Sequence, residues 1–175
     1  MSSNKYEVLF NKEECKGYVI DSKAIKLLEE KWYGARENNK LVLDIVEIAY
    51  LLLGDRAHVI DHKTGDPINS FEDFVNHYYE CLEEFFWPKL IVYKDLRDRG
   101  RRVRVLGEDK FLVRDKYGDL RLVVVLEEGS TRSVISISKN VESAMDNNLK
   151  LVYAIVSLQG DLTYYEVTRI DPKKD

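Results

Sequence analysis

The sequence predicts a two-part chain, in which an α+β N-terminal domain over residues 1–86 is followed by an α/β C-terminal domain with a mixed sheet over residues 87–175. One observation is the change from helical to strand periodicity between Trp87 and Gly107. Another is that short strands and helices precede this segment, whereas long apolar strand patterns follow it. A length of 175 residues also accommodates two small domains as readily as one large one.

The N-terminal domain is expected to begin with two short strands, at residues 6–10 and 17–20, around a polar turn. Asp21 or Ser22 can cap a helix over residues 23–31, because a short polar side chain there accepts a hydrogen bond from the first helical turn. The elements at this end of the chain are therefore small and mixed in type.

The apolar run over residues 41–53 predicts a second helix, with Asp44 and Glu47 three positions apart on one face. Residues 57–60 are expected to form a strand. From Phe71 onward the aromatic residues follow helical spacing up to Pro88, after a capping-box pattern that begins at Ser70.

The segment between Trp87 and Gly107 is predicted to be a helix that leads into a strand. Pro88 suits a first helical position, where its missing N–H costs nothing. Gly100 is placed to supply the left-handed residue that ends the helix. Val103 and Val105 then alternate with arginines, which is typical of a strand.

The C-terminal domain is predicted to contain three strands, a helix and two further strands. Residues 111–114 and the apolar run 120–126 read as strands, and the latter is apolar enough to be buried on both faces. Residues 133–137 fit either a strand or a helix, and residues 139–148 are helical in pattern. Residues 151–156 are expected to pair in parallel with 120–126, because a helical crossover joins them. Residues 162–170 form an alternating final strand.

Composition excludes several classes of protein. An apolar share of 45% supports a buried core, and a net charge of −4 means that any nucleic-acid contact must come from a local basic patch. The start of the chain lacks a secretory signal, and the apolar run at 41–53 is too short to span a bilayer. Cys15 and Cys81 have no metal-like spacing, so free or buried thiols and a cytoplasmic location are expected.

Two clusters could carry chemistry. His58, Asp61 and His62 could hold a metal ion, but without a further ligand a polar turn is the preferred interpretation. The densest basic cluster could contact RNA phosphates or be a solvated helix end with local ion pairs. Its members are Lys94, Arg97, Arg99, Arg101, Arg102 and Arg104. The residues by themselves show no recognisable active site.

Several segments resemble the subunits of the archaeal tRNA-splicing endonucleases. In the first half these are residues 31–34 (KWYG), 43–52 (LDIVEIAYLL) and 71–74 (FEDF). In the second half they are residues 92–100 (VYKDLRDRG), 151–156 (LVYAIV) and 160–167 (GDLTYYEV). The resemblance covers roughly residues 6 to 170 and implies a restriction-endonuclease-like fold for the C-terminal domain.

The resemblance also implies a reaction. Members of the family cut precursor tRNA at both ends of an intron without a metal or other cofactor. A tyrosine acts as general base on the 2′-hydroxyl, a histidine protonates the leaving oxygen and a lysine stabilises the transition state. The products are a 2′,3′-cyclic phosphate and a 5′-hydroxyl.

This chain departs from that pattern at the residues that matter most. Arg114 stands at the tyrosine position, and no histidine follows His77. The lysine position matches Leu149, although a slip of one residue reaches Lys150. The resemblance therefore implies a non-catalytic structural subunit, which joins a catalytic subunit in a 2:2 heterotetramer and contacts precursor tRNA through that complex.

The end of the chain holds the candidate assembly residues. The turn at residues 159–161 matches a family loop that is typically acidic and docks into a basic cleft, although only Asp161 is charged here. The alternative is the closing hairpin of an ordinary domain. The candidates are Asp161, Leu162, Tyr164, Tyr165 and Val167.

Two other functions remain open at this point. One is an active nuclease that uses Tyr117 and Lys150 with an unrecognised acid. The other is a stand-alone RNA-binding module that uses the arginines between Arg97 and Arg104.

Overall fold

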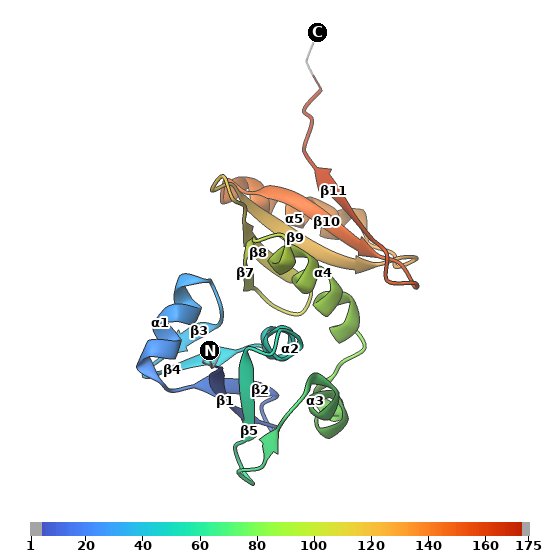
Figure 1. The fold of residues 1–175 in the computed structure, drawn as a ribbon. Coiled ribbons are helices and arrows are strands. Elements are labelled where there is room, and N and C mark those ends of the chain that lie inside the picture. The colour runs from blue at the N-terminus through green and yellow to red at the C-terminus, as the bar shows by residue number, and fades with distance from the viewer. Residues whose placement is uncertain (1–4, 173–175) are drawn as a thin grey trace. The chain divides into compact units, whose positions relative to one another are not determined.

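A computed structural model describes residues 5–172 and divides the chain into two compact units, one up to Lys94 and the other from Asp95 (Figure 1). The division lies within helix α4 (Phe86–Asp98). Residues 1–4 lie outside the described part, and with them the very start on which the expectation of no secretory signal rests. Within residues 5–172 no helix has the length and apolar content needed to cross a membrane.

The first unit is a six-stranded sheet with short helices (Figure 1). Its strands lie in the order β3-β4-β2-β1-β5-β6, and β1 pairs in parallel with β5. The strands are β1 (Tyr6–Asn11), β2 (Lys16–Val19), β3 (Ala35–Glu37), β4 (Lys40–Leu43), β5 (Ala57–Asp61) and β6 (Pro67–Ile68). The helices are α1 (Ser22–Glu30), α2 (Ile45–Leu53), α3 (Phe71–His77) and the 3₁₀ turn η1 (Tyr79–Cys81).

The prediction of one helix over residues 41–53 is wrong, because the run divides into β4 and α2 at Asp44. Asp44 caps α2 by accepting a hydrogen bond from the N–H of Val46 at 3.0 Å. Glu47 is buried and accepts from the N–H of Asp44 and of Gly34, both at 2.8 Å. The two carboxylates thus form a capping box rather than a pair on one helical face.

The continuous helix expected from Phe71 to Pro88 is also wrong. Ser70 caps α3 as predicted, but the helix ends at His77. The hydroxyl of Tyr78 donates a 2.7 Å hydrogen bond to the buried carboxylate of Asp61, which holds the chain away from a helical course. Helix α4 begins at Phe86, so Pro88 is its third residue, still within the first turn where its missing N–H costs nothing.

The cysteines correct a further expectation, because Cys15 and Cys81 form a disulfide instead of remaining thiols. Cys15 lies in the turn between β1 and β2, and Cys81 ends η1. Their Cα atoms are 5.4 Å apart although 66 residues separate them in sequence. Only the pairing of β1 with β2 and β5, and the position of η1, bring the two sulfurs together.

The second unit is a mixed five-stranded sheet, as the sequence predicts, in the order β11-β10-β9-β8-β7 (Figure 1). Strand β9 is central and pairs in parallel with β10, which confirms that prediction. Its elements are β7 (Arg102–Val105), β8 (Lys110–Arg114), β9 (Leu120–Glu127), α5 (Val134–Asp146), β10 (Lys150–Val156) and β11 (Leu162–Val167). The segment 133–137, left open by the sequence, begins helix α5, and the final strand is shorter than expected.

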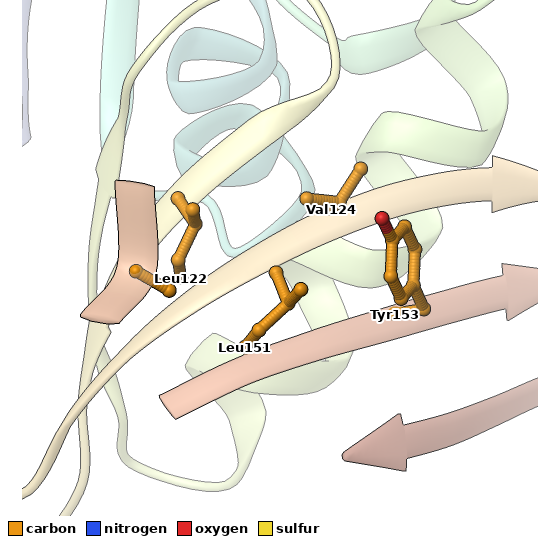
Figure 2. Packing of buried hydrophobic residues seen from close by; sticks show 5 residues of the cluster. Leu122, Val124, Leu151 and Tyr153 are labelled. Carbon is orange, nitrogen blue, oxygen red and sulfur yellow. The ribbon is translucent and has the colours of Figure 1, made fainter. Parts of the chain in front are cut away.

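One face of this sheet carries an apolar core. Figure 2 shows Leu122 and Val124 on β9 beside Leu151 and Tyr153 on β10, and Ala144 of α5 belongs to the same cluster. Leu149 and Val167 pack against it. Burial of side chains of this size stabilises a fold by about 1.5–3 kcal/mol each. The cluster therefore holds α5, β9, β10 and the end of β11 together.

The disulfide predicts a stability difference. Its reduction is expected to lower the free energy of unfolding of the first unit by about 4 kcal/mol, because a cross-link across 66 residues restricts the unfolded chain. Urea unfolding with and without a reductant measures the change through the fluorescence of Trp32 and Trp87, which both lie in this unit.

The control is the double variant Cys15→Ser/Cys81→Ser, which should unfold like the reduced chain and ignore the reductant. Equal midpoints for the oxidised and reduced wild-type chain contradict the prediction.

Candidate functional site

The positions at which the resemblance places the catalytic tyrosine and histidine lie side by side. Arg114 ends β8 and stands directly opposite Leu120, the first residue of β9, in the antiparallel register. The carboxyl end of β8 and the amino end of β9 therefore meet at one edge of the sheet. The resemblance places the histidine at the start of the strand that begins at Leu120, and no histidine lies there.

The strand register also places the side chains of Leu149 and Lys150 on opposite faces of the sheet. In the parallel pair, Lys150 lies opposite Arg121 and Leu151 opposite Leu122. Because successive side chains of a strand point to opposite faces, Leu149 shares the face of Leu122 and the apolar core, against which it packs. Lys150 lies on the other face, together with Arg121.

Arg114 at the end of β8, Leu120 at the start of β9 and Leu149 just before β10 thus lie on the same side of the sheet. A guanidinium stays protonated throughout the physiological pH range, so Arg114 is no general base. Leucine side chains neither donate a proton nor carry charge. This corner of the sheet has no groups for acid–base cleavage of RNA at the three positions.

Beside these positions the surface forms a basic hollow of about 480 Å³, defined by seven residues of the second unit. They are Gly100, Arg102, Arg114, Asp115, Lys116, Tyr117 and Gly118. Arg102 on β7 lies directly opposite Arg114 on β8, and both side chains are exposed. The ring of Tyr117 is 79% exposed, and the ammonium of Lys116 lies 4.9 Å from its centroid.

The turn that carries Lys116 and Tyr117 is organised by the carboxylate of Asp115. It accepts hydrogen bonds from the N–H of Tyr117 at 2.9 Å and of Asp119 at 3.0 Å, and Arg121 lies 3.4 Å away. Burial favours the neutral form of this carboxyl, but the two N–H donors and the charges of Arg121 and Arg101 outweigh it and lower the pKa. The negative charge of Asp115 thus interacts with the backbone of its own turn and with Arg121.

Comparisons with known proteins agree with this architecture. Residues 10–75 match the family model described as tRNA intron endonuclease, N-terminal domain, and residues 86–164 match tRNA intron endonuclease, catalytic C-terminal domain. The tRNA-splicing endonuclease of Methanococcus vannielii is 32% identical over 156 residues, which cover 85% of this chain and 86% of the relative. The chain belongs to the tRNA-splicing endonuclease family.

Two further relatives show a similar degree of likeness. The tRNA-splicing endonuclease of Pyrococcus furiosus is 34% identical over 156 residues, covering 86% of this chain and 89% of the relative. That of Thermococcus kodakarensis is 32% identical over 157 residues, covering 86% of this chain and 90% of the relative.

In this family member, the basic cluster predicted from the sequence is divided among different environments. Arg97 is buried and donates a 2.7 Å hydrogen bond to the carbonyl of Val103. Arg99 donates to Asp95 at 2.8 Å, and this hydrogen bond raises its pKa. Arg101 is half-buried, whereas the side chains of the other three are exposed, namely Lys94 on α4 and Arg102 and Arg104 on β7.

The sequence pattern predicts neither Lys116 nor the pairing of Arg114 with Arg102 as part of a basic site. The resemblance identifies Arg114 only as the residue at the tyrosine position. The signal available in the sequence was the hairpin between residues 105 and 110, whose register decides which arginines face each other.

The three histidines lie in different elements: His58 on β5, His62 in the turn after it and His77 at the end of α3. The carboxylate of Asp61 accepts hydrogen bonds from Tyr78 and from the N–H groups of Lys63 and Thr64. Burial favours the neutral carboxyl, but these hydrogen bonds prevail and lower its pKa. Asp61 therefore supports the turn that begins at His62. Within residues 5–172 no three His, Cys, Asp or Glu side chains gather in a way that suits a metal ion.

Some of the candidate assembly residues are bound within the second unit, whereas others are exposed. Val167 packs on the apolar core, and the hydroxyl of Tyr164 donates a 2.7 Å hydrogen bond to Asp95. Burial and this hydrogen bond raise the pKa of Tyr164. Asp161 and Tyr165 are exposed and Leu162 is half-buried. Strand β11 ends the described sheet, so its outer backbone edge has no strand partner within residues 5–172.

Because Tyr164 donates a hydrogen bond to Asp95, its hydroxyl is expected to contribute more to stability than the hydroxyl of Tyr165. Tyr164→Phe is expected to lower the free energy of unfolding by about 1–2 kcal/mol, because the phenol donates to a carboxylate that is then left without it. Calorimetric melting of the full-length chain measures the loss.

Tyr165→Phe is the matched control, since Tyr165 is 55% exposed and lies on the opposite face of β11. Equal losses for the two variants would show that the Tyr164 hydroxyl has no special role.

Proposed function

We propose that this chain is the non-catalytic structural subunit of a tRNA-splicing endonuclease that removes introns from precursor tRNA. The observation that carries the proposal is the edge of the sheet where Arg114 meets the start of β9, because the resemblance places a tyrosine and a histidine there and this chain has neither. Each missing proton-transfer group costs about 10²–10⁴ in rate. The second unit supplies the fold of the nuclease domain, which we propose is restriction-endonuclease-like, without its chemistry.

The relatives support a part for this chain in tRNA splicing, but they do not distinguish a structural from a catalytic subunit. They are named tRNA-splicing endonucleases, and the match extends through both domains of this chain. A subunit that retains the fold but lacks the reactive groups acts by positioning a catalytic partner, and the partner performs the cleavage to a 2′,3′-cyclic phosphate and a 5′-hydroxyl.

The end of the chain supports assembly with that partner into a 2:2 heterotetramer. An edge strand presents unpaired backbone N–H and C=O groups, which favour pairing with another strand. The outer edge of β11 has this character, and Tyr165 and Asp161 are exposed beside it. The tip of the loop before β11 offers Leu158, which is 90% exposed, so its docking contact combines apolar surface with the single charge of Asp161.

An active site built from Tyr117 and Lys150 has less support. Tyr117 projects from the turn after β8, whereas Lys150 shares the face of Arg121, opposite to that of Arg114. Lys150 is also not among the residues that line the hollow with Tyr117.

The first test is cleavage of a precursor RNA with a bulge–helix–bulge structure. The purified chain alone is expected to cleave on the order of 10⁴-fold more slowly than the assembled enzyme, because it lacks both proton-transfer groups. Addition of the catalytic subunit should restore cleavage, measured by gel analysis of labelled products.

Lys150→Ala in this chain, assembled with the wild-type partner, serves as the control and should cleave at the wild-type rate. Cleavage by the isolated chain, or its loss in the Lys150→Ala complex, contradicts the structural role.

The second test is the composition of the complex. Light scattering coupled to size-exclusion chromatography should give the mass of two copies of this chain with two of the catalytic subunit. A chain that stays monomeric in the presence of its partner is incompatible with the proposal.

A further inference from the structure

The basic hollow places two arginines directly opposite each other on neighbouring strands. Arg102 and Arg114 form a cross-strand pair of like charge, which destabilises a sheet unless an anion lies nearby. Lys116 adds a third cation at the same hollow. The carboxylate within the hollow, Asp115, is already bound to its own turn and to Arg121. The pairing register of β7 and β8, which places Arg102 opposite Arg114, therefore causes the local excess of positive charge.

The hollow also holds an aromatic ring in the open. Tyr117 is 79% exposed, although burial of an aromatic side chain is normally favourable. Its backbone is held by the hydrogen bond from its N–H to Asp115, so the ring projects from an ordered turn. An exposed ring beside cations is the combination by which proteins hold single-stranded nucleic acid, since bases stack on the ring while the cations contact phosphates.

We propose that the basic hollow binds single-stranded RNA, with backbone phosphates on Arg102, Arg114 and Lys116 and one unpaired base stacked on Tyr117. The volume of about 480 Å³ lies in the range of small-ligand sites and accommodates a nucleotide. The choice of RNA among polyanions rests on the proposed function. On this account, the corner of the sheet that has lost its reactive groups still holds RNA.

The geometry also separates this site from the basic cluster predicted from the sequence. Arg97 is engaged with Val103 and Arg99 with Asp95. Arg102 is the member of that cluster that lines the hollow, and the other cations come from β8 and its following turn. The site therefore depends on hairpin register rather than on the local density of arginine in the sequence.

Fluorescence anisotropy of the full-length chain with a labelled oligouridylate tests the proposal. Arg102→Gln and Arg114→Gln should each weaken binding about fivefold at 0.1 M salt and reduce the slope of log K against log salt by about 0.7, because each removes one phosphate contact. Tyr117→Ala should weaken binding about tenfold without changing that slope, because stacking involves no counterion release.

The matched control is Arg36→Gln, which removes an exposed guanidinium paired with Glu29 on the first unit and should change neither quantity. The melting temperature at low salt gives a second measurement: Arg114→Gln should leave it unchanged or raise it, because the substitution relieves repulsion with Arg102. A normal melt then ensures that weaker binding does not reflect misfolding.

Wild-type affinity and salt slope in the double variant Arg102→Gln/Arg114→Gln would overturn the proposal, as would the absence of RNA binding by the wild-type chain. Equal affinity for a duplex of the same length would overturn the stacking role of Tyr117. These measurements use the isolated chain, whereas the proposed structural role is tested by cleavage in the complex, so failure of one is distinguishable from failure of the other.

Discussion

The hydrogen-bonded register of β8, β9 and β10 is the constraint on which the rest of the second unit depends. It places Arg114 opposite Leu120 and aligns Lys150 with Arg121. A shift of one residue would turn every side chain of a strand to the opposite face. The register is secured by the apolar core, because Leu122, Val124, Leu151 and Tyr153 can be buried together only in this alignment (Figure 2). Packing thereby decides which side chains meet at the edge of the sheet.

The same register places the candidate catalytic position at Arg114 within the basic hollow. Arg114 and Leu149 supply neither a base nor a lysine at the positions that the resemblance gives them, and the adjacent hairpin places Arg102 opposite Arg114. Leu149 packs on the apolar core, whereas the side chain of Leu120 is exposed. On our proposals, this corner of the sheet takes no part in cleavage and holds RNA instead.

Much of the second unit was predictable from the sequence, because its strands are long and their periodicity is strong. The sequence predicts the parallel pairing of the apolar runs at 120–126 and 151–156. It also predicts the left-handed conformation of Gly100 just after α4, where φ is 75°. The first unit was less predictable. Asp44 divides an apolar run that looks like one helix, and the hydrogen bond from Tyr78 to Asp61 helps to end α3. A local capping box overrides the periodicity at Asp44, and a tertiary hydrogen bond does so at Tyr78.

The sequence by itself determined the family resemblance, the order of strands and helices in the second unit, and the absence of a histidine after His77, since these depend on residue identity and local pattern. Only the tertiary structure decided that Leu149 rather than Lys150 shares the face of Arg114, that Arg102 stands opposite Arg114, and that Cys15 meets Cys81. These outcomes depend on strand register and on contacts between residues far apart in the chain. Such contacts form only when the whole core packs, so no local pattern contains them.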